Sequence, residues 1–419
     1  MIIIVVMLKN KKVLIVGFGK SGKATANFLA GKIAELSIWD DSEAGRLEIK
    51  KAGFNRPNST DEINFNDLDF IVWSPGIPHY GKNAHELAVR AKSKNCPLIC
   101  DIDLFYQCYP SAKYIGITGS NGKSTSVSLL KHVFDKLEKT AFLGGNIGQA
   151  IFTQPDPKNN FVILELSSYQ LELSPHLKLE IGALLNITPD HLARHYGYEN
   201  YIKAKEEILK KSVKKIICTD TIEAKKLGKK YDATLISTTE KIETNYLKGI
   251  HNSQNINVVS AITDLIKLNK KQVEKAIASF KGLAHRQEFV LEKNGIKYIN
   301  DSKATNAEAI EPALKTFSNI YLIAGGQAKE GGLETVLPLI KEKVKAVFLI
   351  GNSADLFAKQ LENIVPFYQC KTLENAVKIA QEKAVAPATV LLSPACASWD
   401  QFDSFEHRGD AFKKIVQKK

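Results

Sequence analysis

The segment from Tyr114 to Thr125 constrains the fold of this chain more than any other feature. It joins an apolar run to a glycine-rich turn, which leads into a segment whose apolar residues recur at helical spacing from Val127 to Leu137. Such a turn lets backbone N–H groups surround phosphate oxygens at a helix N-terminus, where Lys123 adds positive charge and the Ser124 hydroxyl can bind Mg²⁺. The segment therefore predicts a nucleotide-binding strand, loop and helix within an α/β domain.

The match to the phosphate-loop consensus is incomplete at one position. Ile117 stands five residues before Gly122, where the consensus has glycine. A glycine-rich turn that binds nothing is the alternative, but the strand, the loop, the Lys-Ser pair and the helix all agree with phosphate binding. The candidate ATP-binding residues of this loop are Gly119, Ser120, Asn121, Gly122, Lys123, Ser124 and Thr125.

Short apolar runs alternate with helical periodicity along the chain, which predicts α/β layering with largely parallel sheets. At 419 residues the chain is about three times the length of a typical domain. Pattern changes near Pro110 and Gly282 predict three domains, at residues 1–109, 110–284 and 285–419. Asn294-Gly295, between two short apolar runs, predicts a type I′ hairpin. The other predicted strands are 13–16, 36–39, 70–73, 98–100, 114–118, 161–166, 183–187, 216–219, 320–324, 346–350 and 389–393.

Composition excludes several classes of protein. Hydrophobic residues make up 44% and charged residues 24%, as in globular rather than disordered or fibrous chains. The net charge of +12 comes from scattered lysines without a basic arm, so we expect no nucleic acid partner. The six cysteines lack metal-binding spacing, which favours a cytoplasmic protein. The apolar run ending at Leu8 is too short to cross a bilayer, so we expect no membrane insertion.

Polar residues follow two later apolar runs in a way that fits nucleotide chemistry. Glu165 ends the run that comes one connection after the phosphate loop, and a carboxylate there can bind the Mg²⁺ of a nucleotide. Taken alone, a glutamate at the end of a strand more often faces solvent. His191 and Lys205 follow the next run, and by themselves such residues are usually structural or solvated.

A second glycine-rich segment lies near the start of the chain. The run 13–16 leads into Gly17-Phe18-Gly19-Lys20-Ser21-Gly22, which matches the GxGxxG pattern of dinucleotide-binding folds. Asp40 and Asp41 follow about twenty residues later, where an acid would bind the ribose of NAD. A dehydrogenase is therefore a real alternative, but it does not explain the phosphate loop and Glu165 downstream.

Several strings of residues resemble, in order and over nearly the whole chain, the pattern of the Mur ligase family. These strings are residues 118–124, 144–148, 165–172, 186–191, 249–252, 285–286, 300–306 and 393–398. Extended by residues 399–402 and 405–409, the last string is most similar to the branch that adds D-glutamate. No Asp-Asn-Pro-Arg motif of the branches that add diaminopimelate or lysine occurs.

The resemblance implies a three-domain α/β ligase, with a Rossmann-like N-terminal domain, a central phosphate-loop domain that binds ATP, and a Rossmann-like C-terminal domain that closes the site. It implies amide-bond formation in cytoplasmic peptidoglycan precursor synthesis. In that reaction the carboxylate of UDP-N-acetylmuramoyl-L-alanine takes the γ-phosphoryl group of ATP, and D-glutamate then displaces phosphate. We expect a monomer.

The resemblance also implies two Mg²⁺ sites. Ser124 and Glu165 would hold the first ion, and His191 and Lys205 the second. Because an ammonium group repels Mg²⁺, Lys205 would have to be carbamylated, as the matching lysine of Mur ligases is. Glu165, His191, Lys205 and Lys123 are the candidate catalytic residues. The remaining ATP-binding residues implied by the resemblance are Asn252, Asn255, Arg286 and Asp301.

The two other substrates have their own implied residues. Those for the UDP-sugar are Lys20, Ser21, Asp40, Asp41, Ser74, Pro75, Gly76, Asn146, Ser167, Gln170 and His191. Those for D-glutamate are Thr305, Lys329, Ser398 and Phe405. The chain departs from the family pattern at Ala193, where aspartate is usual, and at Ala328, where glycine or aspartate is common. A folylpolyglutamate-type or other amide ligase, and a basic ATPase that binds nucleic acid, are the alternatives.

Overall fold

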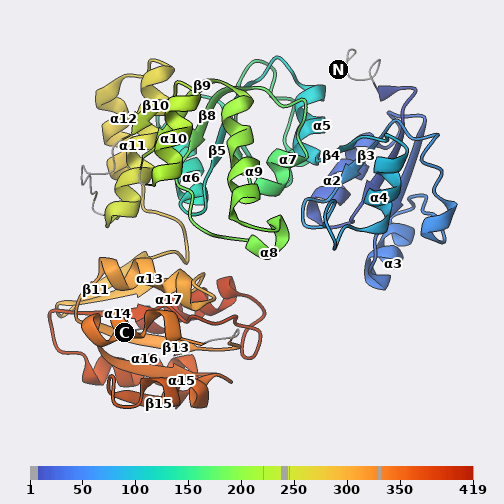
Figure 1. The fold of residues 1–419 in the computed structure, drawn as a ribbon. Helices are drawn as coiled ribbons and strands as arrows, with labels where there is room; N and C mark the ends of the chain where they lie inside the picture. Colours follow the sequence, from blue (N-terminus) through green and yellow to red (C-terminus); the bar gives the residue numbers. More distant parts are fainter. Residues whose placement is uncertain (1–7, 220, 237–243, 245, 329–331, 419) are drawn as a thin grey trace. The chain divides into compact units, whose positions relative to one another are not determined.

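The computed structural model describes residues 8–219, 221–236, 244, 246–328 and 332–418. The chain folds into two compact units (Figure 1). The first unit is Met1–Glu240 with Gln254–Ala276, and the second is Lys241–Ser253 with Ile277–Lys419. The predicted α/β class is confirmed, since the sheets are largely parallel and helices separate their strands. Within the described ranges, no helix is both long and apolar enough to span a bilayer.

The first sheet carries the N-terminal glycine-rich segment. Its strands are parallel in the order β2-β1-β3-β4. Residues 13–16 of β1 are fully buried, as the continuous apolar run of a parallel strand requires. The elements are β1 (Lys12–Val16), α2 (Lys20–Leu29), β2 (Glu35–Trp39), α3 (Glu43–Lys51), η1 (Thr60–Glu62), β3 (Phe70–Trp73), α4 (Glu86–Ser93), β4 (Leu98–Ile99) and α5 (Asp101–Cys108).

The second sheet carries the phosphate loop at the end of β5. Its strands are parallel in the order β10-β9-β8-β5-β7-β6, so the segments that follow β7 and β8 flank this loop. The elements are β5 (Lys113–Thr118), α6 (Lys123–Lys136), β6 (Ala141–Gly145), η2 (Ile151–Thr153), β7 (Phe161–Glu165), α7 (Ser168–Glu172), β8 (Leu179–Leu184), α8 (Leu192–His195), α9 (Tyr198–Lys210), β9 (Ser212–Cys218), α10 (Ile222–Lys230), β10 (Thr234–Ile236), α11 (Ile250–Leu265) and α12 (Lys270–Ser279).

The third sheet lies in the second unit, with the order β11-β12-β16-β13-β14-β15. All its strand pairs are parallel except the hairpin β11–β12. Asn294 and Gly295 have φ angles of 54° and 72°, as a type I′ turn requires, so the predicted hairpin is confirmed. The elements are β11 (Glu288–Lys293), β12 (Ile296–Asn300), α13 (Ala307–Thr316), β13 (Ile320–Gly325), η3 (Glu334–Val336), α14 (Leu337–Lys343), β14 (Val344–Ile350), α15 (Ala354–Leu361), β15 (Phe367–Lys371), α16 (Leu373–Lys383), β16 (Ala388–Leu392) and α17 (Phe405–Gln417).

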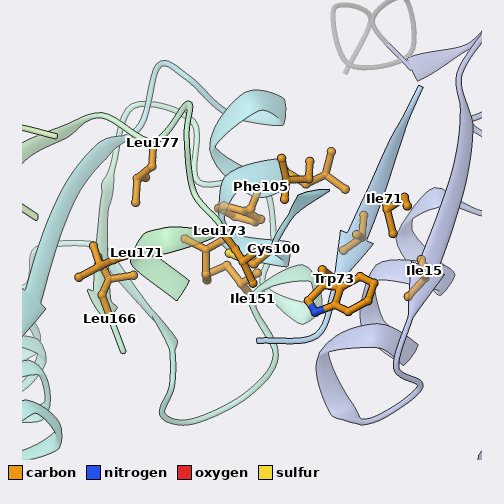
Figure 2. Close-up of a cluster of buried hydrophobic side chains, with 14 of the residues drawn as sticks. Ile15, Ile71, Trp73, Cys100, Phe105, Ile151, Leu166, Leu171, Leu173 and Leu177 are labelled. Carbon is orange, nitrogen blue, oxygen red and sulfur yellow. The ribbon is translucent and has the colours of Figure 1, made fainter. Parts of the chain in front are cut away.

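One apolar cluster joins the first and second sheets. Figure 2 shows part of it, from Trp73 of β3 to Leu173, which follows α7. Phe28 of α2 also stacks on Phe152, with ring centroids 4.3 Å apart. Full burial of a large apolar side chain, such as Trp73 in this cluster, contributes about 1.5–3 kcal/mol. The shared core explains why these two sheets belong to one compact unit, while the domain boundary after residue 109 stays a prediction.

Candidate active site

The loop between β5 and α6 has the shape of a phosphate-binding loop. Gly122 is the N-cap of α6 and has a φ of 85°, a left-handed value that favours glycine. The Nζ of Lys123 donates to the carbonyl oxygens of Gly119 and Ser120, each at 2.7 Å. The amine therefore lies over the loop, and Ser124 and Thr125 follow it in the first helical turn, where phosphate oxygens bind.

Strand pairing explains the departure from the loop consensus. Ile117 lies inside β5 and pairs with Glu165 of β7, so the glycine turn begins only at Gly119. The segment that follows β8 holds this short loop in place, since the N–H of Asn121 donates to Oδ1 of Asn186 at 2.8 Å. The consensus glycine position is thus part of the sheet.

Glu165 presents a buried carboxylate next to this loop. Its side chain is 2% exposed, and its Oε1 accepts a hydrogen bond from Nδ2 of Asn146 at 3.2 Å. Its Oε2 is buried and has no hydrogen-bond partner among the described residues. A buried carboxylate oxygen without a donor is unfavourable, and a bound cation would relieve that cost. Asn146, predicted to bind the UDP-sugar, thus also contacts Glu165.

Lys205 reaches the same loop from α9. It is 2% exposed, and its Nζ donates to the carbonyl of Gly119 at 2.9 Å and to Oγ1 of Thr118 at 3.3 Å. Burial, and then the charge of Lys123, lower the pKa of the Lys205 amine well below its usual value. Since the Gly119 carbonyl accepts from both amines, the structure brings Lys123 and Lys205 together.

His191 lies in the turn that follows the segment after β8. It has a φ of 51°, its side chain is 55% exposed, and its Nε2 lies 3.5 Å from Oδ2 of Asp190. Its ring contacts that of Tyr169, with centroids 5.4 Å apart. No group of three or more His, Cys, Asp or Glu side chains that could hold a metal occurs within the described ranges. The metal sites therefore stay predictions.

The predicted UDP-sugar residues of the first sheet lie around its glycine-rich loop. Lys20 and Ser21 begin α2, at the helix N-terminus that favours phosphate. The Asp40 carboxylate is engaged by the protein, since its Oδ2 accepts the N–H of Phe18 at 2.7 Å. Asp41 accepts from Nε1 of Trp39 at 2.9 Å. Asp40 therefore shapes the glycine-rich loop, whereas the Asp41 carboxylate bonds to Trp39 at the end of β2.

The other predicted UDP-sugar residues come from two loops. Ser74, Pro75 and Gly76 follow β3, and a Cβ on Gly17 would lie 2.6 Å from the Cβ of Ser74, so these residues border the glycine-rich loop. Ser167 and Gln170 form the capping box of α7. In that box the Ser167 N–H donates to Oε1 of Gln170 at 3.0 Å, which is the helix-capping role that competes with ligand binding.

The two asparagines of α11 that are predicted to bind ATP belong to different compact units. Asn255 belongs to the first unit and accepts a hydrogen bond from Oγ of Ser126 in α6 at 3.0 Å. A Cβ on Gly122 would lie 2.4 Å from Oδ1 of Asn255, so this amide reaches the phosphate loop. Asn252 belongs to the second unit and donates to the carbonyl of Lys248 at 2.8 Å.

In the second unit, Asp301, which was predicted to bind ATP, is buried and held by hydrogen bonds. It is 4% exposed and accepts hydrogen bonds from Ser393 Oγ at 2.6 Å and from the Gln287 N–H at 3.1 Å. Burial raises the pKa of its carboxyl group to about 7. The Nε of Arg286 is buried without a partner in the part of the chain that the structure describes.

The predicted D-glutamate residues are partly described. Ser398 is 2% exposed, and Phe405 begins α17, with its carbonyl accepting from Oγ of Ser302 at 2.8 Å. Thr305 is half-buried just before α13. Lys329 lies outside the described residues.

Sequence reasoning missed two residues that organise these loops. His85, far from Asp41 in the sequence, lies with its Nε2 3.0 Å from that carboxylate, and no local motif marks the pair. Arg408 is 1% exposed and donates to the carbonyl oxygens of Ser302 and Cys396, at 2.9 and 3.0 Å. It belongs to the string 405–409, so the resemblance was a signal that could have found it.

Comparison with known proteins gives matches over nearly the whole chain. Residues 117–279 match the family described as Mur ligase middle domain, and residues 285–396 match Mur ligase, glutamate ligase domain. A protein of Paramagnetospirillum magneticum named UDP-N-acetylmuramoylalanine–D-glutamate ligase is 41% identical, over 98% of this chain and 97% of its own. A protein of Rhodospirillum rubrum with the same name is 40% identical, over 96% and 93%.

Solved structures share the fold at low sequence identity. The UDP-N-acetylmuramate-alanine ligase of Thermotoga maritima matches with a TM-score of 0.60 and 18% identity, over 97% of this chain and 99% of its own. A pseudomurein peptide ligase type C from Methanothermus fervidus matches with a TM-score of 0.56 and 16% identity, over the same shares. At these identities the likeness concerns the fold alone.

Proposed function

The chain belongs to the Mur ligase family, and on that basis we propose that it joins D-glutamate to UDP-N-acetylmuramoyl-L-alanine, with ATP, in cytoplasmic peptidoglycan precursor synthesis. One observation carries the proposal. Relatives named for this reaction are about two-fifths identical over almost the full length of both chains.

The reaction needs activation of a carboxylate, which is a poor electrophile. A carboxylate oxygen of the UDP-sugar attacks the γ-phosphorus of ATP, the bond from that phosphorus to the β-γ bridging oxygen breaks, and ADP leaves. The D-glutamate nitrogen then attacks the acyl carbon, the bond to the phosphate oxygen breaks, and the nitrogen loses a proton. Both steps bring anions together, so the site must supply positive charge.

Lys123 and the loop amides supply part of that charge. The amine lies over the loop, held by two carbonyl oxygens, and can turn to the β- and γ-phosphates without a change in the helix. Because the loop lies at the N-terminus of α6, the backbone N–H groups from Gly122 onward add the positive end of the helix dipole.

Glu165 and Ser124 fit a first Mg²⁺ site. The buried Oε2 of Glu165 lacks a donor within the described residues, and Asn146 fixes the other oxygen, which leaves one carboxylate oxygen available to a hard cation. Mg²⁺ there would neutralise charge on the phosphates and on the attacking carboxylate. The protein's own part is to hold the Glu165 oxygen in place through Asn146.

Lys205 fits carbamylation. Its lowered pKa keeps a fraction of the buried amine neutral, and a neutral amine can attack CO₂ to give a carbamate and a proton. The product is an anion and would replace a buried cation that faces Lys123. We assign the carbamate and His191 to a second Mg²⁺ site.

D-glutamate carries two carboxylates, so its pocket needs donors. We assign this role to Thr305, Lys329, Ser398 and Phe405, the last supplying its backbone and ring. Arg408 supports the assignment, since from within the second unit it donates to the carbonyl oxygens of Ser302 and Cys396 and so fixes the segments that carry Thr305 and Ser398.

The uridine diphosphate group is assigned to the first sheet. The N-terminus of α2 suits a diphosphate, and Ser74 to Gly76 border the same loop. Asp40 contributes by holding the N–H of Phe18, which fixes the loop that faces the phosphates.

The test is phosphate release by the purified chain with ATP, Mg²⁺ and UDP-N-acetylmuramoyl-L-alanine. We expect release with D-glutamate and none above background with L-glutamate, lysine or diaminopimelate. Phosphate release with lysine and not with D-glutamate would show that the amino-acid substrate is lysine, while the chain would still be an amide ligase. Release that depends on DNA or RNA and ignores the UDP-sugar would refute the whole proposal.

A further inference from the structure

The turn that carries His191 is not stable by its own local structure. Residues 191–197, called here the His191 turn, contain α8, which is only four residues long. Non-glycine residues with left-handed backbone bound this helix, since His191 and Tyr196 have φ angles of 51° and 56°. Each such residue is in an unfavourable backbone conformation, and a helix this short has no stability of its own. Tertiary contacts must therefore hold the turn.

Many of these contacts come from one loop segment between β3 and α4. Residues 77–83, called here the docking segment, directly follow the Ser74–Gly76 loop assigned to the UDP-sugar. Nη2 of Arg194 donates to the carbonyl of Ile77 at 3.3 Å, and the Asn83 N–H donates to the Tyr196 hydroxyl at 3.0 Å. The docking segment and the His191 turn both belong to the first compact unit.

Arg194 is enclosed by aromatic rings from both sides of this contact. Its guanidinium lies 5.3 Å from the ring of Tyr80 in the docking segment and 5.0 Å from that of Tyr169 in α7. The ring of Tyr169 also contacts His191. Cation–π contacts of this kind are favourable and fix the plane of the guanidinium. Arg194 therefore links the docking segment to the ring against which His191 packs.

A buried chain of polar groups reinforces the link. His195 is fully buried, with Nε2 2.9 Å from Oγ of Ser168 and Nδ1 3.0 Å from the hydroxyl of Tyr80. The Tyr80 hydroxyl donates to Oε1 of Glu172 at 3.1 Å. These bonds are all satisfied when Ser168 donates to His195 and His195 donates to Tyr80. The chain runs from the docking segment into α7.

Close packing makes Gly81 a sensitive point in the docking segment. Gly81 has a φ of 78°, and a Cβ there would lie 2.0 Å from the ring of Tyr196. Any side chain at this position must displace the tyrosine whose hydroxyl accepts the Asn83 N–H.

We propose that the docking segment holds the His191 turn in its working geometry, with Arg194 and Tyr196 as positioning residues of the ligation. The inference rests on the proposed function. Through these contacts the loop that binds the UDP-sugar and the turn that carries His191 move as one body. The reacting carboxylate and the catalytic centre are thereby kept aligned.

The test compares two glycine variants of the full chain. Gly81→Ala displaces Tyr196, whereas Gly53→Ala has a similar φ of 74° but open space around it, so it reproduces the backbone strain alone. We expect kcat to fall about 10-fold or more in Gly81→Ala, because misalignment near 1 Å can cost up to about 100-fold. Binding of ATP alone and of UDP alone, measured by calorimetry, should stay within about twofold of the wild type.

A second background separates positioning from general destabilisation. In Tyr196→Ala, which removes the ring, adding Gly81→Ala should lower kcat no further than Gly53→Ala does. Arg194→Lys keeps the charge but loses the planar fork, and should lower kcat with ATP binding unchanged. Equal kcat values for Gly81→Ala and Gly53→Ala would overturn the inference, as would a parallel loss of ATP and UDP binding. Absence of ligation by the wild type counts instead against the proposed function.

Discussion

Glu165 shows how one atom can reveal a binding role. Its Oε2 is buried and lacks a partner within the described residues, although most buried carboxylate oxygens in folded proteins accept hydrogen bonds. A carboxylate kept in that state is expensive unless a cation completes its surroundings. The environment of this oxygen therefore distinguishes Glu165 from a glutamate that merely ends a strand.

Glu165→Gln tests that role. The amide keeps the shape of the side chain and loses the charge, so we expect ligation to fall by roughly 100-fold or more, with a raised Mg²⁺ requirement. Phosphate release measured across Mg²⁺ concentrations checks this, with circular dichroism to verify folding. Glu199→Gln, an exposed carboxylate of α9, is the matched control and should behave like the wild type. An unchanged Mg²⁺ dependence in Glu165→Gln would remove Glu165 from the metal site.

Lys205 is tested through replacement of its proposed carbamate. Lys205→Ala deletes the side chain and leaves space near Gly119, so ligation should be lost and partly restored by millimolar formate or acetate. The added carboxylate supplies the anionic oxygen that the carbamate would supply. Initial rates with and without these anions decide the matter, and full activity of the alanine variant without additives would show that no carbamate is needed.

At the scale of elements, the phosphate loop combines strain and close packing. Gly122→Ala forces a left-handed alanine and brings its Cβ against Asn255. We expect ATP affinity to fall by at least about 10-fold, because the strain and the shift of the loop both act on the backbone N–H groups that hold phosphate. Calorimetric titration with ATP measures this. Gly31→Ala has a φ of 70° and open space around its Cβ, so it should leave ATP affinity unchanged. An equal loss of ATP affinity in both variants would show that the effect does not arise in the phosphate loop.

Elements with a strong local signal were predictable from sequence. The buried central strands are continuous apolar runs, and the Asn294-Gly295 hairpin follows from two residues that tolerate positive φ. The edge strands β6, β10 and β15 were not predicted, because each is short or contains glycine or polar residues that interrupt its apolar run. β8 is Leu179–Leu184, so it begins and ends earlier than the predicted strand 183–187, and the buried residues after Leu184 continue as loop.

At the scale of the whole molecule, the candidate site was predictable only where the fold brings strand ends together. Lys123 follows β5 and Glu165 ends the neighbouring parallel strand β7, so the order of these elements implies their proximity. The contact of Arg194 with Ile77 depends on how the first sheet packs on the second, and no local pattern encodes it. The same limit applies to the single core shared by these two sheets.

Among the described residues, each compact unit contains a carboxyl group that burial makes harder to ionise at neutral pH. Burial raises the pKa of Glu172 in the first unit, and of Asp301 in the second, to about 7. In the unfolded chain both groups ionise near pH 4, so between pH 4 and 7 the unfolded state releases protons that the folded state retains. The free energy of unfolding should therefore be highest below pH 4 on this account, fall as pH rises, and level off above about pH 7.

Asp301→Asn isolates the contribution of Asp301, in the second unit, to the pH dependence of the free energy of unfolding. The amide can still accept the Gln287 N–H and donate to Ser393, but it cannot ionise. The variant should therefore lose much less stability than the wild type between pH 5 and 8, the difference over that range being roughly 3 kcal/mol at most. Denaturant unfolding at several pH values, followed by fluorescence, measures it. Glu382→Gln, an exposed carboxylate of α16, should retain the wild-type pH dependence. If the free energy of unfolding of Asp301→Asn and of the wild type depended on pH in the same way, Asp301 would already be ionised at pH 5. The charge of Arg286 and the hydrogen bonds to Asp301 would then lower its pKa more than burial raises it.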